Sequence, residues 1–546
     1  MTETTAGIFL ERIVAATRAH LDERRQHTPL DAMRALASEA PPPRSFAQAL
    51  RPAAGSSARL IAEVKRASPS KGLLAERFDP VAQARAYAAG GAAAISVLTE
   101  PDFFHGSLDH LRAVRAAVDV PVLRKDFLLD PYQVYEARAA GADAVLLICA
   151  LLDDATLRAL LALARSLRME ALVEAHNAEE ARRAVDAGAA VIGVNSRDLR
   201  TFAVDGDVVR RLRPLVPTDR IFVAESGIGD ARGAARARAF GADAILVGEA
   251  LMRAQSPEQL ARRLASVPGG ATARFFGATA NPYVKICGLK TSEAVRAALD
   301  SGADAFGLIF APSRRQVTLE HARQLVAAAR AYSANPAQAD SAPNSRPSHL
   351  TLDYGSPSPR RGGGQGERAA RVTDPLAIGV FVNETVERIA EVAAFVGLDA
   401  VQLSGDESPE TCAAVAAATG LPVLRALRLR TIDELPLLDD YALAGATLML
   451  DTPADDGSYG GTGQPGDWRL AAEAARRWPI ILAGGLTPDN LAGALAEVGP
   501  RGVDVSSGVE TDGAKDADKI AAFLRVAREG TPFSAINGRS RRAEGP

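Results

Sequence analysis

The sequence predicts an α/β protein made of two tandem (β/α)8 TIM barrels, the first with an N-terminal helical extension. Three observations support this prediction. The 546 residues exceed what one hydrophobic core organises and fit two domains of roughly 250 residues. A short glycine-containing phrase recurs in both halves, each time before an apolar segment. Each half offers eight such segments, the number that closes a barrel.

The recurring phrase marks the end of a helix, a tight turn and the start of a strand. Glycine suits the end of a helix because it adopts positive φ readily, and a continuous apolar run suits a parallel strand covered on both faces. Strands that alternate with helices predict a parallel sheet. The phrase occurs as AGGAAAISVL (89–98), AGADAVLLI (140–148), AGAAVIGVN (187–195), FGADAILVG (240–248), SGADAFGLIF (301–310) and VGLDAVQLSG (396–405).

The strands can be placed in order along each half. In the first half they are predicted at 60–65, 93–98, 121–125, 143–148, 170–174, 190–195, 221–225 and 243–247. In the second half they are predicted at 283–287, 305–310, 376–381, 399–403, 421–425, 446–451, 479–483 and 502–505. Residues 1–46 precede the first strand and are predicted to form the added helices.

These elements divide the chain into domains. We expect one barrel domain at 1–267, a linker at 268–282, a second barrel domain at 283–530 and a flexible tail at 531–546. Within the second domain, the stretch 333–373 is rich in Pro, Gly, Ser and Arg, which predicts a disordered insertion. This insertion connects a helix to the next strand, so we expect it at the end of the barrel opposite the active site. An RGG-like nucleic-acid-binding segment is the alternative interpretation.

Composition and charge exclude several classes of protein. The chain is 47% hydrophobic and 24% charged with a formal net charge of −3, which is typical of a globular protein and indicates no nucleic-acid or membrane partner. Its three cysteines are far apart, so we expect no disulfide framework, no metal site and a reducing cytoplasm. The N-terminus lacks the basic start of a signal peptide, and the longest apolar run, 144–152, is too short to span a bilayer. The sequence favours no particular oligomeric state.

Charged residues gather at the predicted carboxyl ends of the first eight strands. Side chains alternate faces along a strand, so Ile61, Glu63 and Lys65 point the same way. One such residue can form a structural ion pair, but several on consecutive strands meet in one pocket, where buried charges are paired or used in chemistry. The candidates are Glu63, Lys65, Lys125, Glu174, Asn195, Arg197 and Glu225, with Ser226, Gly227 and Gly248 in the turns where barrels bind phosphate.

The second half has its own candidate residues. Cys287 ends the first strand of this half, and Asp451 ends the sixth. A lone cysteine on a core strand is usually an inert small hydrophobic residue. This one precedes a glycine, faces a carboxylate and lies next to two Gly/Ser turns, which favours a chemical role. Those turns contain Gly484, Gly485, Ser507 and Gly508.

The motifs EVKRASPSKG, LRKDF, LVEAHN, GVNSRDL and AESGI, in this order within residues 1 to about 265, resemble the indole-3-glycerol phosphate synthase family. That family closes the indole ring of a carboxyphenylamino-deoxyribulose phosphate, losing carbon dioxide and water. The resemblance implies that Lys125 is the general acid and Glu174 the general base, that Lys65 assists proton transfer and that Glu63 orients Lys65. It further implies that the substrate and its phosphate are held by Ser68, Asn195, Arg197, Glu225, Ser226, Gly227 and Gly248.

The motifs KICGL, LDT and AGGL, within roughly 282–525, resemble the phosphoribosylanthranilate isomerase family, which performs an Amadori rearrangement. The resemblance implies that Cys287 is the base that takes the proton from the sugar C2 and that Asp451 is the acid that opens the ring. Such chemistry needs a matched acid and base and no cofactor. The loop GLIFAPSRRQV supplies the arginine for the substrate, and we assign Arg315, with Arg314 as the open alternative. The turns at Gly484, Gly485, Ser507 and Gly508 would complete the site.

Together the two resemblances imply a bifunctional enzyme of tryptophan biosynthesis that acts on small phosphorylated substrates. Ser404 stands where the isomerase family usually has histidine, so the alternative is a second barrel retained mainly as a weakly active or structural module. Other phosphate-sugar isomerase barrels lack the EVKRASPSKG and KICGL strand ends. The stretch GTGQPG (461–466) matches GxGxxG, but no strand precedes it, which disfavours dinucleotide binding.

Overall fold

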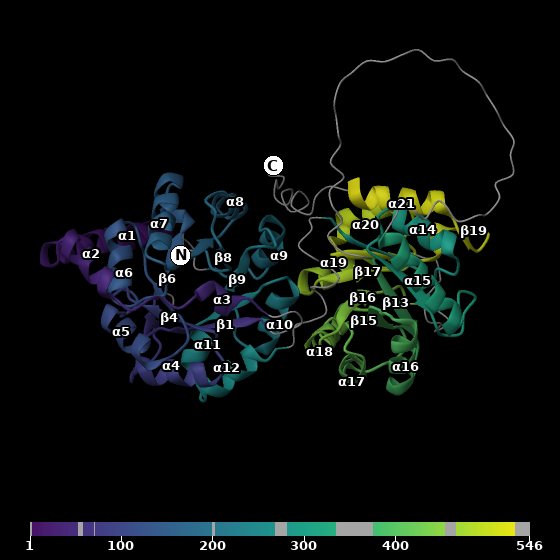
Figure 1. The fold of residues 1–546 in the computed structure, drawn as a ribbon, viewed down its shortest axis with the longest axis horizontal. Coiled ribbons are helices and arrows are strands. Elements are labelled where there is room, and N and C mark those ends of the chain that lie inside the picture. Colours follow the sequence, from purple (N-terminus) through teal and green to yellow (C-terminus); the bar gives the residue numbers. More distant parts are fainter. Residues whose placement is uncertain are drawn as a thin grey trace, which may run out of the picture.

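In a computed structural model the chain forms two closed eight-stranded barrels that lie side by side (Figure 1). The structure describes residues 3–52, 58–69, 71–198, 203–267, 281–334, 375–453 and 466–529. The predicted linker, insertion, tail and GTGQPG stretch lie almost wholly outside these residues. The described exceptions are 281, 282 and 466, which lie outside helices and strands, and 333 and 334, where a helix continues over the first two positions of the expected insertion.

The first barrel confirms the prediction strand by strand. All eight strands are parallel, and the ring closes between β1 and β10. The strands are β1 (Arg59–Val64), β4 (Ala94–Leu98), β5 (Val122–Lys125), β6 (Ala144–Ile148), β7 (Glu170–Ala175), β8 (Val191–Asn195), β9 (Ile221–Glu225) and β10 (Ala244–Val247).

The second barrel is built in the same way. Its eight parallel strands follow one another in chain order, and the ring closes between β11 and β18. The strands are β11 (Tyr283–Cys287), β12 (Ala305–Ile309), β13 (Leu376–Phe381), β14 (Ala400–Leu403), β15 (Val423–Leu427), β16 (Thr447–Leu450), β17 (Ile480–Leu482) and β18 (Gly502–Val505).

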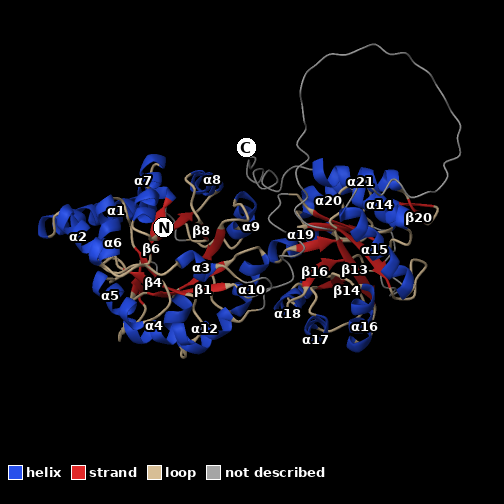
Figure 2. Ribbon diagram, viewed as in Figure 1, coloured by secondary structure: helices blue, strands red, loops and turns tan. Residues whose placement is uncertain are grey.

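Helices surround both rings of strands (Figure 2). Around the first barrel they are α4 (Pro80–Ala89), α5 (Leu108–Ala117), α6 (Pro131–Ala139), α7 (Asp154–Ser166), α8 (Ala178–Asp186), α9 (Val208–Leu212), α10 (Ala231–Ala239), α11 (Glu249–Arg253) and α12 (Pro257–Ala265). Around the second they are α14 (Ser292–Asp300), α15 (Leu319–Ala334), α16 (Val386–Val396), α17 (Pro409–Thr419), α18 (Leu437–Leu443), α19 (Trp468–Arg477), α20 (Leu491–Val498) and α21 (Ala517–Glu529). Among the described helices, none is long and apolar enough to cross a membrane.

The predicted N-terminal extension consists of α1 (Glu3–His27), α2 (Leu30–Glu39) and α3 (Phe46–Leu50). Phe46 and Leu50 of α3 are fully buried and pack against the side chains inside the first barrel. The backbone N–H of Ala47 donates to the carboxylate of Glu170, the first residue of β7. Helix α3 therefore covers the amino ends of the strands and leaves their carboxyl ends for the site.

Aspartates in the recurring phrase hold neighbouring strands in register. Asp143, directly before β6, accepts the N–H of Val122 on β5 at 2.7 Å. In the second barrel, Asp304 accepts the N–H of Val284 at 2.7 Å. Asp243 and Asp399 do the same for Phe222 and Ala377, each at 2.9 Å. Each of these aspartates thus satisfies an N–H near the start of the preceding strand.

The glycines of the phrase have the predicted backbone conformation. Gly241 and Gly302 adopt φ of +92° and +93°, a region that L residues with a side chain rarely enter. This conformation lets each helix turn back directly into the next strand, as the sequence predicted.

The two barrels meet where α10 lies beside α18. The Nη1 of Arg232 is 3.0 Å from Oδ2 of Asp439, which is buried. Asp439 also accepts from Arg477 at 2.6 Å and from the indole nitrogen of Trp478 at 2.7 Å. Arg232 is half exposed, so its ion pair adds little stability and mainly favours one orientation of the two barrels.

Candidate active sites

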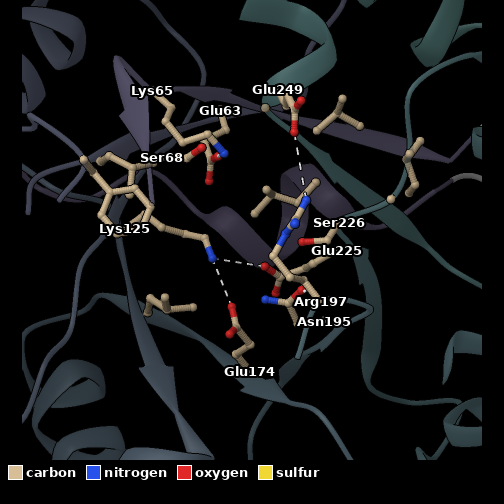
Figure 3. A pocket seen from close by; sticks show the side chains of 18 of the residues that line it. Glu63, Lys65, Ser68, Lys125, Glu174, Asn195, Arg197, Glu225, Ser226 and Glu249 are labelled. Carbon is tan, nitrogen blue, oxygen red and sulfur yellow. Dashed lines mark hydrogen bonds and ion pairs between the residues drawn. The ribbon is translucent and has the colours of Figure 1, made fainter. Parts of the chain in front are cut away.

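A cavity of about 370 Å³ lies at the carboxyl ends of the strands of the first barrel. Figure 3 shows its charged side chains, with Lys125, Glu174 and Glu225 directed toward one another. Every residue predicted for this site lines the cavity: Glu63, Lys65, Ser68, Lys125, Glu174, Asn195, Arg197, Glu225, Ser226, Gly227 and Gly248.

Lys125 at the end of β5 is held between two carboxylates. Its Nζ is 3.0 Å from Oε2 of Glu174 and 3.2 Å from Oε2 of Glu225. Burial disfavours the ammonium charge, but the carboxylates outweigh burial and raise the pKa of Lys125. The lysine is therefore a cation in this site.

The two glutamates beside Lys125 differ in protonation. Burial and repulsion by Glu174 raise the pKa of Glu225 to about 8, although Lys125 opposes the shift. Glu174 is equally buried, but Lys125 and His176 hold its pKa below the usual range. When the pKa values of two neighbouring carboxylates are separated in this way, one is ionised and can act as a base while the other stays protonated. Here Glu174 is the ionised carboxylate and Glu225 the protonated one.

Glu63 and Lys65 form a second ion pair on β1, as strand alternation predicted. Their charged atoms are 2.6 Å apart, and Glu63 is buried. A Cβ at Gly248 would lie 2.4 Å from Oε1 of Glu63 and 3.1 Å from Nζ of Lys65. Glycine at position 248 is therefore needed to leave room for this pair.

Some lining residues were not predicted from the sequence. Phe104 and Phe127 form part of the wall, with ring centroids 6.1 Å apart, and give the cavity an aromatic side. Glu249 also lines it, and its Oε2 is 3.9 Å from Nη2 of Arg197 (Figure 3). Phe127 is the last residue of the LRKDF motif and lies two positions after the end of β5, so a search for apolar residues after strand ends would have found it.

A cavity of about 550 Å³ lies at the corresponding end of the second barrel. The predicted residues Cys287, Arg315, Asp451, Gly484, Gly485, Ser507 and Gly508 all line it. Arg428, Gln402, Ser404, Asp504 and Ser506 line it as well and were not predicted as site residues.

Cys287 has a charged neighbour on its own strand. Lys285 is fully buried on β11, and its Nζ is 2.9 Å from Oδ1 of Asp504 on β18. Burial raises the pKa of the Cys287 thiol, while Lys285 favours the thiolate and limits the shift. The ammonium of Lys285 therefore lowers the cost of forming a thiolate inside the barrel.

Asp451 is placed to be a proton donor. Burial raises the pKa of its carboxyl, and Arg428, 3.9 Å away, opposes that rise. A buried carboxyl with a raised pKa keeps its proton at higher pH and can deliver it to a substrate oxygen. A thiol and a carboxyl, groups that can act as base and acid, thus line one cavity.

The two arginines of the loop after β12, Arg314 and Arg315, differ in position. Arg315 lines the cavity and binds Glu510 through Nε at 2.6 Å and Nη2 at 2.9 Å. Arg314 binds the same glutamate at 2.9 Å, but its side chain is 62% exposed. The position of Arg315 favours it as the arginine that contacts a ligand.

In the Gly/Ser turns after β17 and β18 the backbone packs tightly against neighbouring residues. A Cβ at Gly508 would lie 1.8 Å from the carbonyl oxygen of Leu486, and one at Gly484 would lie 2.0 Å from Oγ1 of Thr452. Neither position tolerates a side chain without movement of its surroundings. Backbone N–H groups in such turns can approach an anion closely.

Two barrels of parallel strands, each with acid–base groups and Gly/Ser turns at the carboxyl ends of the strands, define a tandem pair of barrel enzymes. Residues 10–264 match the family model described as "Indole-3-glycerol phosphate synthase". Residues 365–526 match the model described as "N-(5'phosphoribosyl)anthranilate (PRA) isomerase".

Several known proteins are similar to this chain. An "Indole-3-glycerol phosphate synthase" from Roseiflexus sp. (strain RS-1) is 55% identical over 264 residues, covering 47% of this chain and 97% of the relative. "Multifunctional tryptophan biosynthesis protein" names relatives from Phycomyces blakesleeanus (40% identical, 90% of this chain, 65% of the relative) and Phanerodontia chrysosporium (38%, 95% and 70%). The solved phosphoribosyl anthranilate isomerase from Thermotoga maritima is 32% identical and covers 45% of this chain and 98% of its own, with a TM-score of 0.34.

The chain belongs to the family of multifunctional tryptophan biosynthesis proteins, with an indole-3-glycerol phosphate synthase domain followed by a phosphoribosylanthranilate isomerase domain. It spans 65% of the length of the Phycomyces blakesleeanus relative.

Proposed function

We propose that the chain catalyses two reactions on small phosphorylated substrates. The second barrel isomerises N-(5-phosphoribosyl)anthranilate to 1-(2-carboxyphenylamino)-1-deoxyribulose 5-phosphate, and the first barrel converts that product to indole-3-glycerol phosphate. The observation that carries the proposal is Lys125, held between Glu174 and Glu225 in a cavity bordered by Gly/Ser turns. We further propose domain boundaries at 1–267 and 283–530 and a cytoplasmic location.

In the isomerase site, proton transfer alone accounts for the reaction. Asp451 gives its proton to the ring oxygen, and the ring opens to an imine. The Cys287 thiolate takes the proton from C2, which leaves an enol that becomes the ketone when a proton returns to C1. No atom is gained or lost, and the general acid and base each lower one barrier. Arg315 would bind the carboxylate of the anthranilate part of the substrate.

In the synthase site, the aromatic carbon that bears the carboxylate attacks the ketone carbon. Lys125 protonates the developing alkoxide, carbon dioxide leaves and the ring regains aromaticity. Glu174 then takes a proton from the methylene carbon beside the ring nitrogen while Lys65 gives a proton to the hydroxyl, which leaves as water and completes the indole. Lys65 assists these transfers and is oriented by Glu63. A cation beside an alkoxide in a site shielded from water stabilises the transition state strongly.

Phosphate binding would use the turns after the last two strands of each barrel. In the first barrel these are Ser226, Gly227 and Gly248, while Asn195, Arg197, Glu225 and Ser68 would bind the rest of the substrate. In the second barrel the turns contain Gly484, Gly485, Ser507 and Gly508. Ser507 and Gly508 line the cavity next to Gly484 and Gly485, which supports this assignment.

The test is to give the purified chain each substrate separately and to follow both products. We expect isomerisation of the anthranilate substrate and, independently, indole formation from the ketose phosphate. Complementation of tryptophan auxotrophs that lack one activity or the other tests the same point in cells. Indole formation without isomerisation would support the alternative, a second barrel retained as a structural module.

A further inference from the structure

His176 has no role in the reactions above, yet its imidazole is held between two carboxylates. It directly follows β7, and its Nε2 is 3.3 Å from Oε1 of Glu174. On the other side of the ring, Nδ1 is 3.1 Å from Oε2 of Glu180. The side chain is 10% exposed, so little water competes for either contact.

Glu180 is itself fixed at the start of α8. Its carboxylate accepts the backbone N–H of His176 at 2.9 Å and the side-chain amide of Asn177 at 2.7 Å. The N–H of Glu180 in turn donates to Oδ1 of Asn177 at 3.0 Å, which caps the helix. Glu180 therefore cannot turn away from the imidazole without breaking the helix start.

This arrangement determines the protonation of the ring. An ionised carboxylate has no hydrogen to give, so a ring nitrogen that faces one must supply the hydrogen itself. Nδ1 of His176 forms a hydrogen bond with Glu180 and Nε2 lies at ion-pair distance from Glu174, an arrangement that favours the doubly protonated imidazolium. Burial opposes that charge, but Glu174 and Glu180 outweigh it and raise the pKa of His176 to about 10.

Other charges near the ring do not change this conclusion. Lys125 and Glu225 lie beyond Glu174, on the cavity side. The short segment before α7 contributes Cys149, whose thiol has a pKa raised to about 12 by burial and is therefore neutral. Arg183 of α8 is directed away from the ring, because it donates to the carbonyl of Cys149 and to Asp154.

The two oxygens of Glu174 thus face different partners. Oε2 faces Lys125 in the cavity, whereas Oε1 faces His176 behind it. The described residues that line the cavity do not include His176.

We propose that His176 is a positioning residue for ring closure, an imidazolium that holds Oε1 of Glu174 so that Oε2 remains directed at the substrate and ionised. This inference rests on the proposed role of Glu174 as general base. Glu180 serves as the second counter-ion that keeps the imidazole charged and oriented. Glu180, His176 and Glu174 are arranged like a catalytic triad, in which one residue orients a second and the second orients the third. Here the third residue is the proposed general base, Glu174, where a triad has a nucleophile.

The experiment compares His176→Gln and Glu180→Gln with the wild-type chain. In His176→Gln, ring closure should fall at least tenfold in kcat with KM changed less than threefold, because the residue does not contact the substrate. The acid limb of the ring-closure pH profile should move to higher pH by about one unit, since Glu174 loses a neighbouring cation and its pKa rises. Glu180→Gln should move the limb in the same direction by less.

The matched control is Asp79→Ala, which removes the N-cap of α4 in the same barrel and leaves His176, Glu174 and Glu180 unchanged. It should lower the melting temperature without moving the acid limb. Isomerase activity measured on the same samples should stay at the wild-type level in all three variants. A His176→Gln enzyme with an unshifted acid limb, or with kcat within threefold of wild type, would overturn the inference.

A direct measurement keeps the proposal separate from the proposed function. In ¹⁵N-histidine NMR of the full chain, one resonance absent from His176→Gln should remain imidazolium above pH 8, while an exposed histidine titrates near 6.5. Titration of that resonance near pH 6.5 would refute the proposal that His176 is held as an imidazolium between Glu174 and Glu180. If the wild-type chain did not form the indole product, the proposed function would fail, and the NMR result would still report the state of His176.

Discussion

Replacing Lys125 with methionine tests the synthase site most directly. Methionine has a similar length but carries no charge and no proton to give. Loss of a general acid typically costs 10²–10⁴-fold in rate, which corresponds to about 2.7–5.4 kcal/mol of transition-state stabilisation. We therefore expect indole formation to fall by at least 100-fold, and isomerase activity, which belongs to the other barrel, to stay within twofold.

The stability effect can be worked out from the same contacts. Two charges about 3 Å apart attract by roughly 5 kcal/mol at an effective dielectric constant near 20, and desolvation of the ions offsets most of this. Without Lys125, the carboxylates of Glu174 and Glu225 are left facing each other at 1% exposure each. Removal of one partner from a buried pair costs about 3–5 kcal/mol when the remaining charge persists.

The sign of the pH dependence follows from Glu225. Its pKa is already raised to about 8 in the folded chain, and loss of the Lys125 cation raises it further. A carboxyl with a raised folded-state pKa stabilises the fold while it is protonated and loses that contribution as pH rises through the folded-state value. The melting temperature of Lys125→Met should therefore fall more, relative to wild type, at pH 9 than at pH 6.

The assay measures indole formation by absorbance and the melting temperature by calorimetry, with Lys125→Arg as the matched control. Arginine keeps the charge but hardly gives up its proton, so this variant should be close to wild type in stability and still inactive in ring closure. Two results would refute the reasoning: ring closure within tenfold of wild type in Lys125→Met, or equal loss of both activities in folded protein.

Three further outcomes follow from the second barrel. Cys287→Ser should lower isomerase turnover more than tenfold, a cost above about 1.4 kcal/mol; a smaller loss would mean that the cysteine is only a packed side chain. Arg315→Gln should raise the isomerase KM more than tenfold and Arg314→Gln less than twofold, and the reverse order in steady-state kinetics would assign the other arginine. Gly508→Ala should weaken binding of a phosphate-bearing product analogue in calorimetry, because its Cβ would lie 1.8 Å from the Leu486 carbonyl oxygen; unchanged affinity would remove this turn from the site.

The positions of the strands were predictable because each has a local apolar run, which in six cases follows a glycine turn. One boundary shows what local signals miss. The fifth strand of the second barrel was predicted at 421–425 but runs from Val423 to Leu427. Pro422 has no N–H to give to a neighbouring strand, so pairing begins one residue later. Because the strand end was predicted two residues too early, Arg428, which directly follows the observed end, was not recognised as a site residue.

Site residues could be predicted where the alternation of side chains along a strand determines which of them point into the barrel. Alternation identified Glu63 and Lys65, and the same argument applied to β11 would have placed Tyr283, Lys285 and Cys287 on one face. The pairing of Lys285 with a carboxylate 219 positions later depends on the closure of the barrel, which no local pattern contains. Phe104 lies in a loop whose course is set by packing, so its place in the wall could not be predicted.

The aspartates before β6, β10, β12 and β14 have a consequence for how such a protein can evolve. Each accepts an N–H from the strand directly before it, so the alignment of the ring is assembled from contacts between neighbouring strands. A strand–helix unit that contains such an aspartate can set the register of its own strand against whichever strand precedes it. Units of this kind could be duplicated, exchanged or recombined between the two halves while the chemistry at the opposite ends of the strands diverged.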